Sequence, residues 1–157
     1  MSPAQRPPRW LTPTQMKAWR AFIETVGDLT MALERDLIPT GLTVGDYQVL
    51  VYLSEATDRQ MRMSDLADRL QLTPSGLTRR LDGLVRHKWV DRVPSDRDRR
   101  VTMAQLTPAG FAVLEAAAPI HVESVQRRIF DHLNLEQVRH LGTAFTAIAT
   151  GLEQDPS

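Results

Sequence analysis

The sequence predicts a mainly α-helical chain with one small β-hairpin. Apolar residues recur at three-to-four spacing through most of the chain, which is the period of an amphipathic helix. Only residues 89–106 change to a strand, a polar turn and a second strand. The 157 residues, of which 42% are hydrophobic, suit one unit that can bury a core, so residues 1–157 are expected to form a single domain.

A long first helix is expected within residues 10–38. Gln15 lies three positions after Thr12, which is a capping-box pattern, and Pro13 suits the first helical turn. Pro39 then ends the helix, since proline cannot continue it. The apolar stripe of this helix contains Met16, Trp19, Phe22, Ile23, Val26, Leu29, Leu33 and Leu37.

A second helix is expected from about Thr43 to Ala56. Asp46 completes a second capping-box pattern at its start. Polar residues 57–60 interrupt the helical pattern, and residues 61–63 are compatible with a very short strand.

Two short helices are expected next, close together in the sequence. Ser64 is the expected cap of the first, which ends near Leu72. Thr73 and Pro74 start the second at once, and it runs to about His87. A turn of only about three residues between two helices is the spacing of a helix-turn-helix.

The hairpin follows the second of these helices directly. Its two apolar strands flank the polar segment 94–100. A β-hairpin in this place is a wing, so residues 43–106 are expected to form a winged helix-turn-helix module.

Two further helices are expected after the wing, within residues 108–153. Their apolar stripes, like that of residues 10–38, cannot all be covered by so small a winged module. Packing against a second copy of the chain would bury them. Residues 10–38 and 108–153 are therefore expected to be the dimerisation helices of a homodimer.

The charge distribution indicates a nucleic-acid partner, although the formal net charge is zero. Eight of the 19 Lys and Arg residues lie between Arg79 and Arg100, against four aspartates. Clustered cations form a local basic patch that a sum over the chain hides. Double-stranded DNA is the expected partner.

The helix that starts at Pro74 is the expected recognition helix. Helical geometry places Arg79 and Arg86 opposite its leucines, and the fork of Arg79 can bond the two acceptors of guanine in the major groove. Ser75 and the free amides after Thr73 suit a phosphate or a base edge. On the flanks of this face, Thr78 and Arg80 are expected to contact the DNA backbone, and Gly76 and Gly83 would let that backbone approach closely.

The wing has alternating charges at its turn. Arg97, near the tip, is the expected residue for a narrow minor groove, and Asp98 is the expected structural partner of a neighbouring arginine. The full set of expected DNA-contacting residues is Thr73, Ser75, Gly76, Thr78, Arg79, Arg80, Arg86, Arg97, Arg99 and Arg100.

Several of these segments resemble the MarR family of bacterial regulators. They are residues 64–72, residues 73–79, and residues 98–100 through 106–110, the last ending in a specific Leu-Thr-x-x-Gly motif. The resemblance extends over nearly the whole chain. It implies an obligate homodimer in which the first and the last two helices interlock, and two winged modules that bind a short palindrome.

The resemblance also implies functional positions and a signal. The recognition positions of the family fall on Ser75, Thr78 and Arg79, and its wing arginine falls on Arg97, Arg99 or Arg100. Many members release DNA when a small aromatic or phenolic ligand binds between the dimerisation helices and the winged module. The redox-sensing branch depends on cysteine, which this sequence lacks.

A crevice for such a ligand can be assembled from several side chains. Trp10, Trp19 and Tyr47 could line it, with Arg20 or His121 meeting an acid group. The competing interpretation is that Trp19 and Tyr47 belong to the core and that Arg20 is solvated.

Other classes of function find no support in the sequence. The absence of cysteine excludes disulfides and thiolate metal sites, and the spacing of the four histidines suits no metal. Neither a Gly-x-Ser-x-Gly motif nor a phosphate-binding glycine loop is present, so neither an enzyme nor a cofactor is expected. Without a membrane-length apolar run or a signal-peptide pattern, the protein is expected in the cytoplasm.

The sequence thus predicts a sequence-specific transcriptional regulator, a repressor that a small aromatic ligand releases from a palindromic operator. Two alternatives stay open. One is a winged-helix module whose wing contacts an acidic protein partner. The other is a constitutive regulator without a ligand, in which side chains would fill the crevice.

Overall fold

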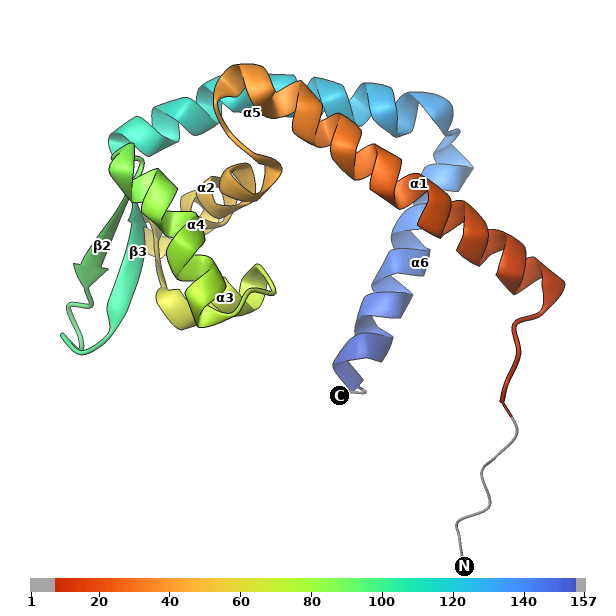
Figure 1. The fold of residues 1–157 in the computed structure, drawn as a ribbon, viewed down its shortest axis with the longest axis horizontal. Coiled ribbons are helices and arrows are strands. Elements are labelled where there is room, and N and C mark those ends of the chain that lie inside the picture. The colour runs from red at the N-terminus through yellow and green to blue at the C-terminus, as the bar shows by residue number, and fades with distance from the viewer. Residues whose placement is uncertain (1–7, 155–157) are drawn as a thin grey trace, which may run out of the picture.

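The computed structural model describes residues 8–154. Figure 1 shows α1 and α5 as a long upper layer, with the module of α2, α3, α4 and the sheet beneath one end and α6 descending near the other. The elements in chain order are α1 (Pro13–Leu37), α2 (Val44–Glu55), β1 (Gln60–Arg62), α3 (Met63–Arg69), α4 (Pro74–Arg86), β2 (Val90–Pro94), β3 (Thr102–Leu106), α5 (Pro108–Arg128) and α6 (Leu135–Gln154), with short 3-10 turns at Ile38–Thr40, Thr57–Arg59 and Phe130–His132.

Threonine caps begin four of the helices. Thr12, Thr43, Thr73 and Thr107 each accept a hydrogen bond from the backbone amide three residues on, at 3.0–3.3 Å. Each bond satisfies one of the amides that an α-helix leaves unpaired at its first turn. The helix starts predicted at Thr12, Thr43 and Thr73 are therefore confirmed, and the cap at Thr107 agrees with the helix expected from residue 108.

The start and the end of α3 differ from the prediction. The helix begins at Met63 with Arg62 in the capping position, and Arg62 makes no side-chain cap bond. Ser64 lies inside the first turn instead, where its hydroxyl bonds the Asp65 carboxylate, so its prediction as the cap was wrong. The helix ends at Arg69 rather than near Leu72, because Gln71 adopts a positive φ of 54° that breaks the helical backbone.

The three strands form one antiparallel sheet in the order β1-β3-β2. Ala104 in the middle of β3 pairs with Met61 on one side and Arg92 on the other. The short strand is thus present, one residue earlier than predicted. Because β2 lies at the edge of the sheet, it pairs only with β3. The hairpin of β2 and β3 is therefore joined to β1 through β3 alone.

The hydrophobic core lies in the winged module. Buried leucines from α2, α3 and α4 meet Val90 and Ala104 of the sheet there, and Leu114 and Ala117 of α5 cover them. By contrast, α6 contains no buried residue and α1 contains only Leu37. The apolar stripes of these two helices are left uncovered within one chain.

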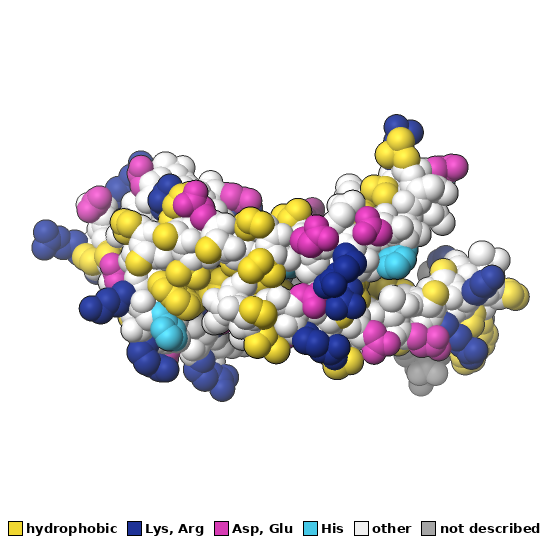
Figure 2. Space-filling view, turned by 90° about the horizontal axis from the view of Figure 1, so that it is seen from above, with side chains coloured by type: hydrophobic (Ala, Val, Ile, Leu, Met, Phe, Trp, Pro, Cys, Tyr) yellow, Lys and Arg dark blue, Asp and Glu magenta, His cyan; other side chains and the backbone are white. Residues whose placement is uncertain are grey.

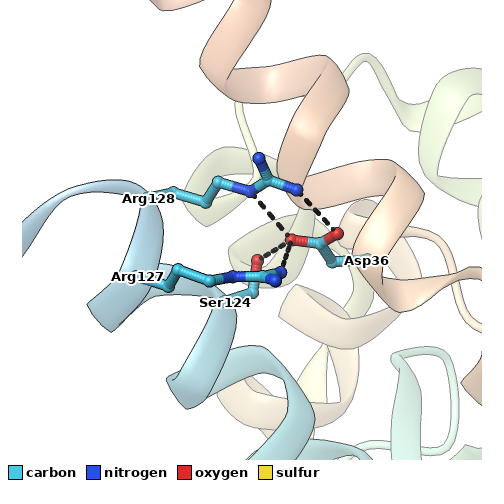
Figure 3. A network of polar contacts seen from close by, with 4 residues as sticks. All are labelled: Asp36, Ser124, Arg127 and Arg128. Atoms are coloured by element: carbon cyan, nitrogen blue, oxygen red, sulfur yellow. Dashed lines mark hydrogen bonds and ion pairs between the residues drawn. The ribbon is translucent and has the colours of Figure 1, made fainter.

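A polar cluster joins the end of α1 to the end of α5 (Figure 3). The Asp36 carboxylate accepts hydrogen bonds from the Ser124 hydroxyl at 2.5 Å and from the guanidinium groups of Arg127 at 3.0 Å and Arg128 at 3.0 and 3.1 Å. Ser124 is fully buried. The hydrogen bonds from Arg128 and Ser124 hold the pKa of Asp36 far below its usual value.

We predict that Asp36→Asn lowers the thermal stability of the protein at neutral pH, because two arginines and a buried hydroxyl lose their charged acceptor. A carboxyl whose pKa is depressed on folding contributes stability above its unfolded pKa of about 4, and loses that contribution as the pH falls toward its folded pKa. The difference in melting temperature between the native protein and the variant should therefore shrink below about pH 4.

Thermal unfolding followed by circular dichroism between pH 2 and 7 measures this difference. Asp28→Asn is the matched control, since Asp28 is an exposed residue of the same helix that forms no ion pair within residues 8–154. A melting-temperature difference that stays constant across the pH range contradicts the prediction.

Candidate nucleic-acid interface

The recognition face of α4 follows from how this helix is buried. Leu77, Leu81 and Leu84 are at most 2% exposed and fix the orientation of the helix on the core. The opposite face presents Ser75, Thr78, Arg79, Asp82 and Arg86 to solvent. The division of the helix into two faces, predicted from its period, is confirmed.

The N-terminus of α4 is shaped by the Thr73 cap. The Thr73 hydroxyl accepts from the Gly76 amide at 3.1 Å and lies 3.2 Å from the Ser75 hydroxyl. A Cβ at position 76 would lie 3.1 Å from the same Thr73 oxygen, so glycine also serves the cap itself. The Thr78 hydroxyl bonds back to the Pro74 carbonyl at 3.0 Å, and both Ser75 and Thr78 are exposed at the start of the helix.

Arg80 points back into the module rather than outward. Its Nη1 donates to the Thr43 hydroxyl at 3.3 Å and lies 3.8 Å from the Asp46 carboxylate, at the start of α2. A Cβ at position 45 would collide with the guanidinium, so Gly45 makes room for it. In this arrangement Arg80 joins α4 to α2, a role that the sequence pattern did not reveal.

The turn of the wing is ordered by its own polar contacts. The Ser95 amide bonds the Val101 carbonyl at 2.8 Å, which closes the loop. The Arg100 guanidinium donates to both oxygens of Asp98, at 3.1 and 3.2 Å, and lowers the pKa of that carboxyl. The predicted structural role of Asp98 is confirmed, and within residues 8–154 Arg97 and Arg99 have no acidic partner at salt-bridge distance.

A contact between the wing and α4 was missed by sequence reasoning. Arg92 of β2 reaches across to α4, where its Nη2 lies 2.8 Å from the Asp82 carboxylate and 3.0 Å from the Thr78 carbonyl oxygen. Only the alternation of the strand, which places residue 92 on the face opposite residues 91 and 93, could have suggested it.

The predicted ligand crevice is only partly assembled within one chain. Tyr47 and His121 face each other, with ring centroids 4.4 Å apart, beside a hollow of about 310 Å³. Leu33, Val44, Gln48, Val51, Tyr52 and Val125 line the rest of it. The structure does not bring Trp10, Trp19 and Arg20 to this hollow: Arg20 lines a separate hollow on α1, and the tryptophans are 83% and 52% exposed.

Burial sets the chemistry of the two facing rings. Desolvation raises the pKa of Tyr47 and lowers the pKa of His121, so burial favours the neutral form of both rings. The His121 Nδ1 atom is buried and has no hydrogen-bond partner within the described residues. The contact between His121 and an acid group of a ligand stays a prediction.

Residues 8–154 contain no group of three or more His, Asp or Glu side chains placed to hold a metal ion. They also contain no helix that is long and apolar enough to cross a membrane.

Comparisons with known proteins agree with this architecture. The model of the MarR family matches residues 40–101. The chain is 30% identical to the HTH-type transcriptional repressor YetL of Bacillus subtilis over 69% of this chain and 67% of that protein. Two solved Streptomyces coelicolor MarR-family regulators are also similar. AbsC has 40% identity and a TM-score of 0.88 over 94% of this chain and 100% of that one. Sco3205, solved in complex with DNA, has 37% identity and a TM-score of 0.87 over 92% of this chain and 91% of that one.

The fold and the similarities lead to one assignment. Winged helix-turn-helix geometry, an arginine-bearing recognition helix and similarity along nearly the full chain occur together. The chain belongs to the MarR family of DNA-binding transcriptional regulators.

Proposed function

We propose that this protein is a homodimeric repressor that binds a palindromic operator, with α4 in the major groove and the wing in the adjacent minor groove. The observation that carries the proposal is the exposed face of α4, where Ser75 and Arg79 stand opposite the buried leucines. Similarity to a regulator solved in complex with DNA, and to one named a repressor, supports it. Two-fold symmetry would then set half-sites about 10 base pairs apart.

A protein-interaction module is the second candidate, with the wing on an acidic partner. The exposed hydroxyl and guanidinium of α4 favour DNA, because they match the acceptors of phosphates and of guanine, whereas a protein interface is centred on desolvated apolar residues. Arg97 at the wing suits either partner. The recognition helix therefore decides between the two.

We predict that Arg79→Ala weakens binding to the selected operator by about 1–3 kcal/mol and relaxes specificity at one base pair, because a bidentate base contact is lost. Arg97→Ala should weaken binding and reduce the dependence on salt by about one counterion. The measurement is fluorescence anisotropy at two salt concentrations, on duplexes selected from genomic fragments.

Arg139→Ala, which removes an exposed arginine of α6, is the control for loss of charge alone. The DNA assignment fails if the native protein selects no palindrome, or if Arg79→Ala and Arg139→Ala bind the operator equally well.

The dimer part of the proposal rests on apolar side chains that one chain leaves uncovered. Trp19 and Phe22 of α1 and Phe145 and Ile148 of α6 are each 43–57% exposed. Phe22 and Phe145 lie close together, with ring centroids 6.2 Å apart, so the two helices present one continuous apolar surface. Figure 2, which views the α1 and α5 layer from above, shows further hydrophobic side chains over the half of the layer that lies above the winged module, and charged side chains near its middle. A second copy offers an equally apolar surface, which makes self-association the expected cover.

We predict that Ile148→Glu converts the protein from dimer to monomer, because a buried carboxylate without a partner opposes association. Sedimentation equilibrium measures the mass of the species in solution. Affinity for the operator should fall when the dimer is lost. Thr143→Glu lies on the other face of α6 and should leave the dimer intact. A native protein that sediments as a monomer contradicts the proposal.

The ligand part of the proposal places a small aromatic effector in the hollow beside Tyr47 and His121. The hollow lies between α2 of the winged module and α1 and α5 of the dimerisation helices, so an occupant would contact both parts. A ligand that prefers one arrangement of these parts shifts DNA occupancy by that preference alone.

We predict that phenol or benzoate raises the melting temperature of the native protein, since a ligand that binds only the folded state stabilises it. Gln48→Trp should fill the hollow, abolish this shift and leave operator binding without ligand unchanged. Differential scanning fluorimetry measures the shift. If neither compound shifts the native protein, the constitutive regulator without a ligand is the better description.

A further inference from the structure

One guanidinium supplies a polar contact between the wing and the exposed flank of α4. Arg92 is on β2, and its Nη2 donates to the Asp82 carboxylate and to the Thr78 carbonyl oxygen, at 2.8 and 3.0 Å. Thr78 and Asp82 are one helical turn apart, so the guanidinium lies along the flank of α4. Val90 of β2 also packs in the core with the leucines of α4, and Arg92 adds the polar contacts between this strand and the recognition helix.

The ion pair is exposed to solvent, which limits its contribution to folding. The side chains of Arg92 and Asp82 are 31% and 49% exposed. Ion pairs at such positions stabilise the folded state only slightly, because water screens them. The buried leucines hold α4 in place without this pair, so its effect must be sought in the relative position of the two DNA-contacting elements.

The pair also changes the charge that α4 presents to DNA. Asp82 is the only acidic residue of α4 and lies on its exposed side, where an unpaired carboxylate would repel phosphates. Arg92 neutralises this carboxylate and leaves Arg79 and Arg86 as the dominant charges of the face. Because Arg92 is committed to α4, it is not a free cation of the basic patch.

We propose that Arg92 and Asp82 are a positioning pair that holds the wing at a fixed distance from α4, so that Arg97 enters the minor groove while Arg79 occupies the neighbouring major groove. The inference rests on the proposed function, since it assumes that both elements contact DNA. The edge position of β2 supports it, because the ladder with β3 alone leaves that strand without a partner on its outer side. A shift of about 1 Å in such a support is enough to weaken a binding site.

The test is a double-mutant cycle between the pair and Arg97. Arg92→Met and Asp82→Asn, each with and without Arg97→Ala, are titrated against a palindromic duplex that the native protein selects from random double-stranded DNA. In the native background, Arg97→Ala should weaken binding by at least about fivefold. In either variant background, the same substitution should cost less than about twofold, because the wing no longer sits where Arg97 can contact the groove.

The two substitutions of the pair change the net charge in opposite directions, which separates positioning from simple electrostatics. Simple electrostatics requires that Asp82→Asn tighten binding, that Arg92→Met weaken it, and that Arg97→Ala keep its full effect in both; this result overturns the proposal. Arg69→Met is the control for removing an arginine, since its guanidinium lies over the Tyr52 ring rather than between wing and helix.

Two further readouts keep the outcomes distinct. Melting temperatures of the nearly isosteric Asp82→Asn and of Arg92→Met should stay close to that of the native protein, and a global loss of folding in both overturns a positioning role. If Arg97→Ala has no effect in the native protein, the positioning proposal is overturned. The effect of Arg79→Ala on the same duplex shows independently whether the proposed DNA binding by α4 stands.

Discussion

The burial of one face of α4 is the constraint on which the rest of the interface depends. Leu77, Leu81 and Leu84 are almost fully buried, and replacing such a leucine with alanine typically costs about 2–5 kcal/mol. Because these three side chains fix the rotation of the helix, Ser75 and Arg79 have to face solvent. The exposed face of α4 is thus determined by which residues the core buries, and its polar residues contribute little to folding.

Local signals explain why so much of the fold was predictable. Each threonine cap involves only residues three positions apart, so the sequence alone indicates where the helix starts. This holds for Thr12, Thr43, Thr73 and Thr107. The predicted start of α3 was wrong because a local pattern alone was used to place it. Ser64 looks like a cap, yet the short strand β1 runs directly into Met63 and leaves no room for an extended residue at position 64.

The contacts that sequence reasoning missed join residues that lie between 10 and 92 positions apart in the chain. Arg80 meets Thr43 and Asp46, Arg92 meets Asp82, and Asp36 gathers Arg127 and Arg128. Each acid and base looks like a solvated surface charge in the sequence, where nothing indicates which partner it has. The predicted crevice shows the same limit. Of the five residues expected to share it, Tyr47 and His121 line the hollow, whereas Trp10, Trp19 and Arg20 lie elsewhere, because the sequence does not indicate the path of α1 relative to α2 and α5.

The pairing of these arginines changes how the basic patch acts on DNA. Eight cations lie between Arg79 and Arg100, but Arg80, Arg92 and Arg100 are each engaged by an aspartate of the same chain. DNA releases bound counterions when protein cations neutralise its phosphates. A guanidinium that is already paired with a carboxylate neutralises phosphates less and therefore releases fewer counterions. The salt dependence of DNA binding should therefore reflect only the arginines that have no acidic partner, and under our proposal the paired Arg92 holds the wing in position on α4. A chain of zero net charge can bind DNA in this way because its acids neutralise the structural arginines and leave Arg79 and Arg97 free.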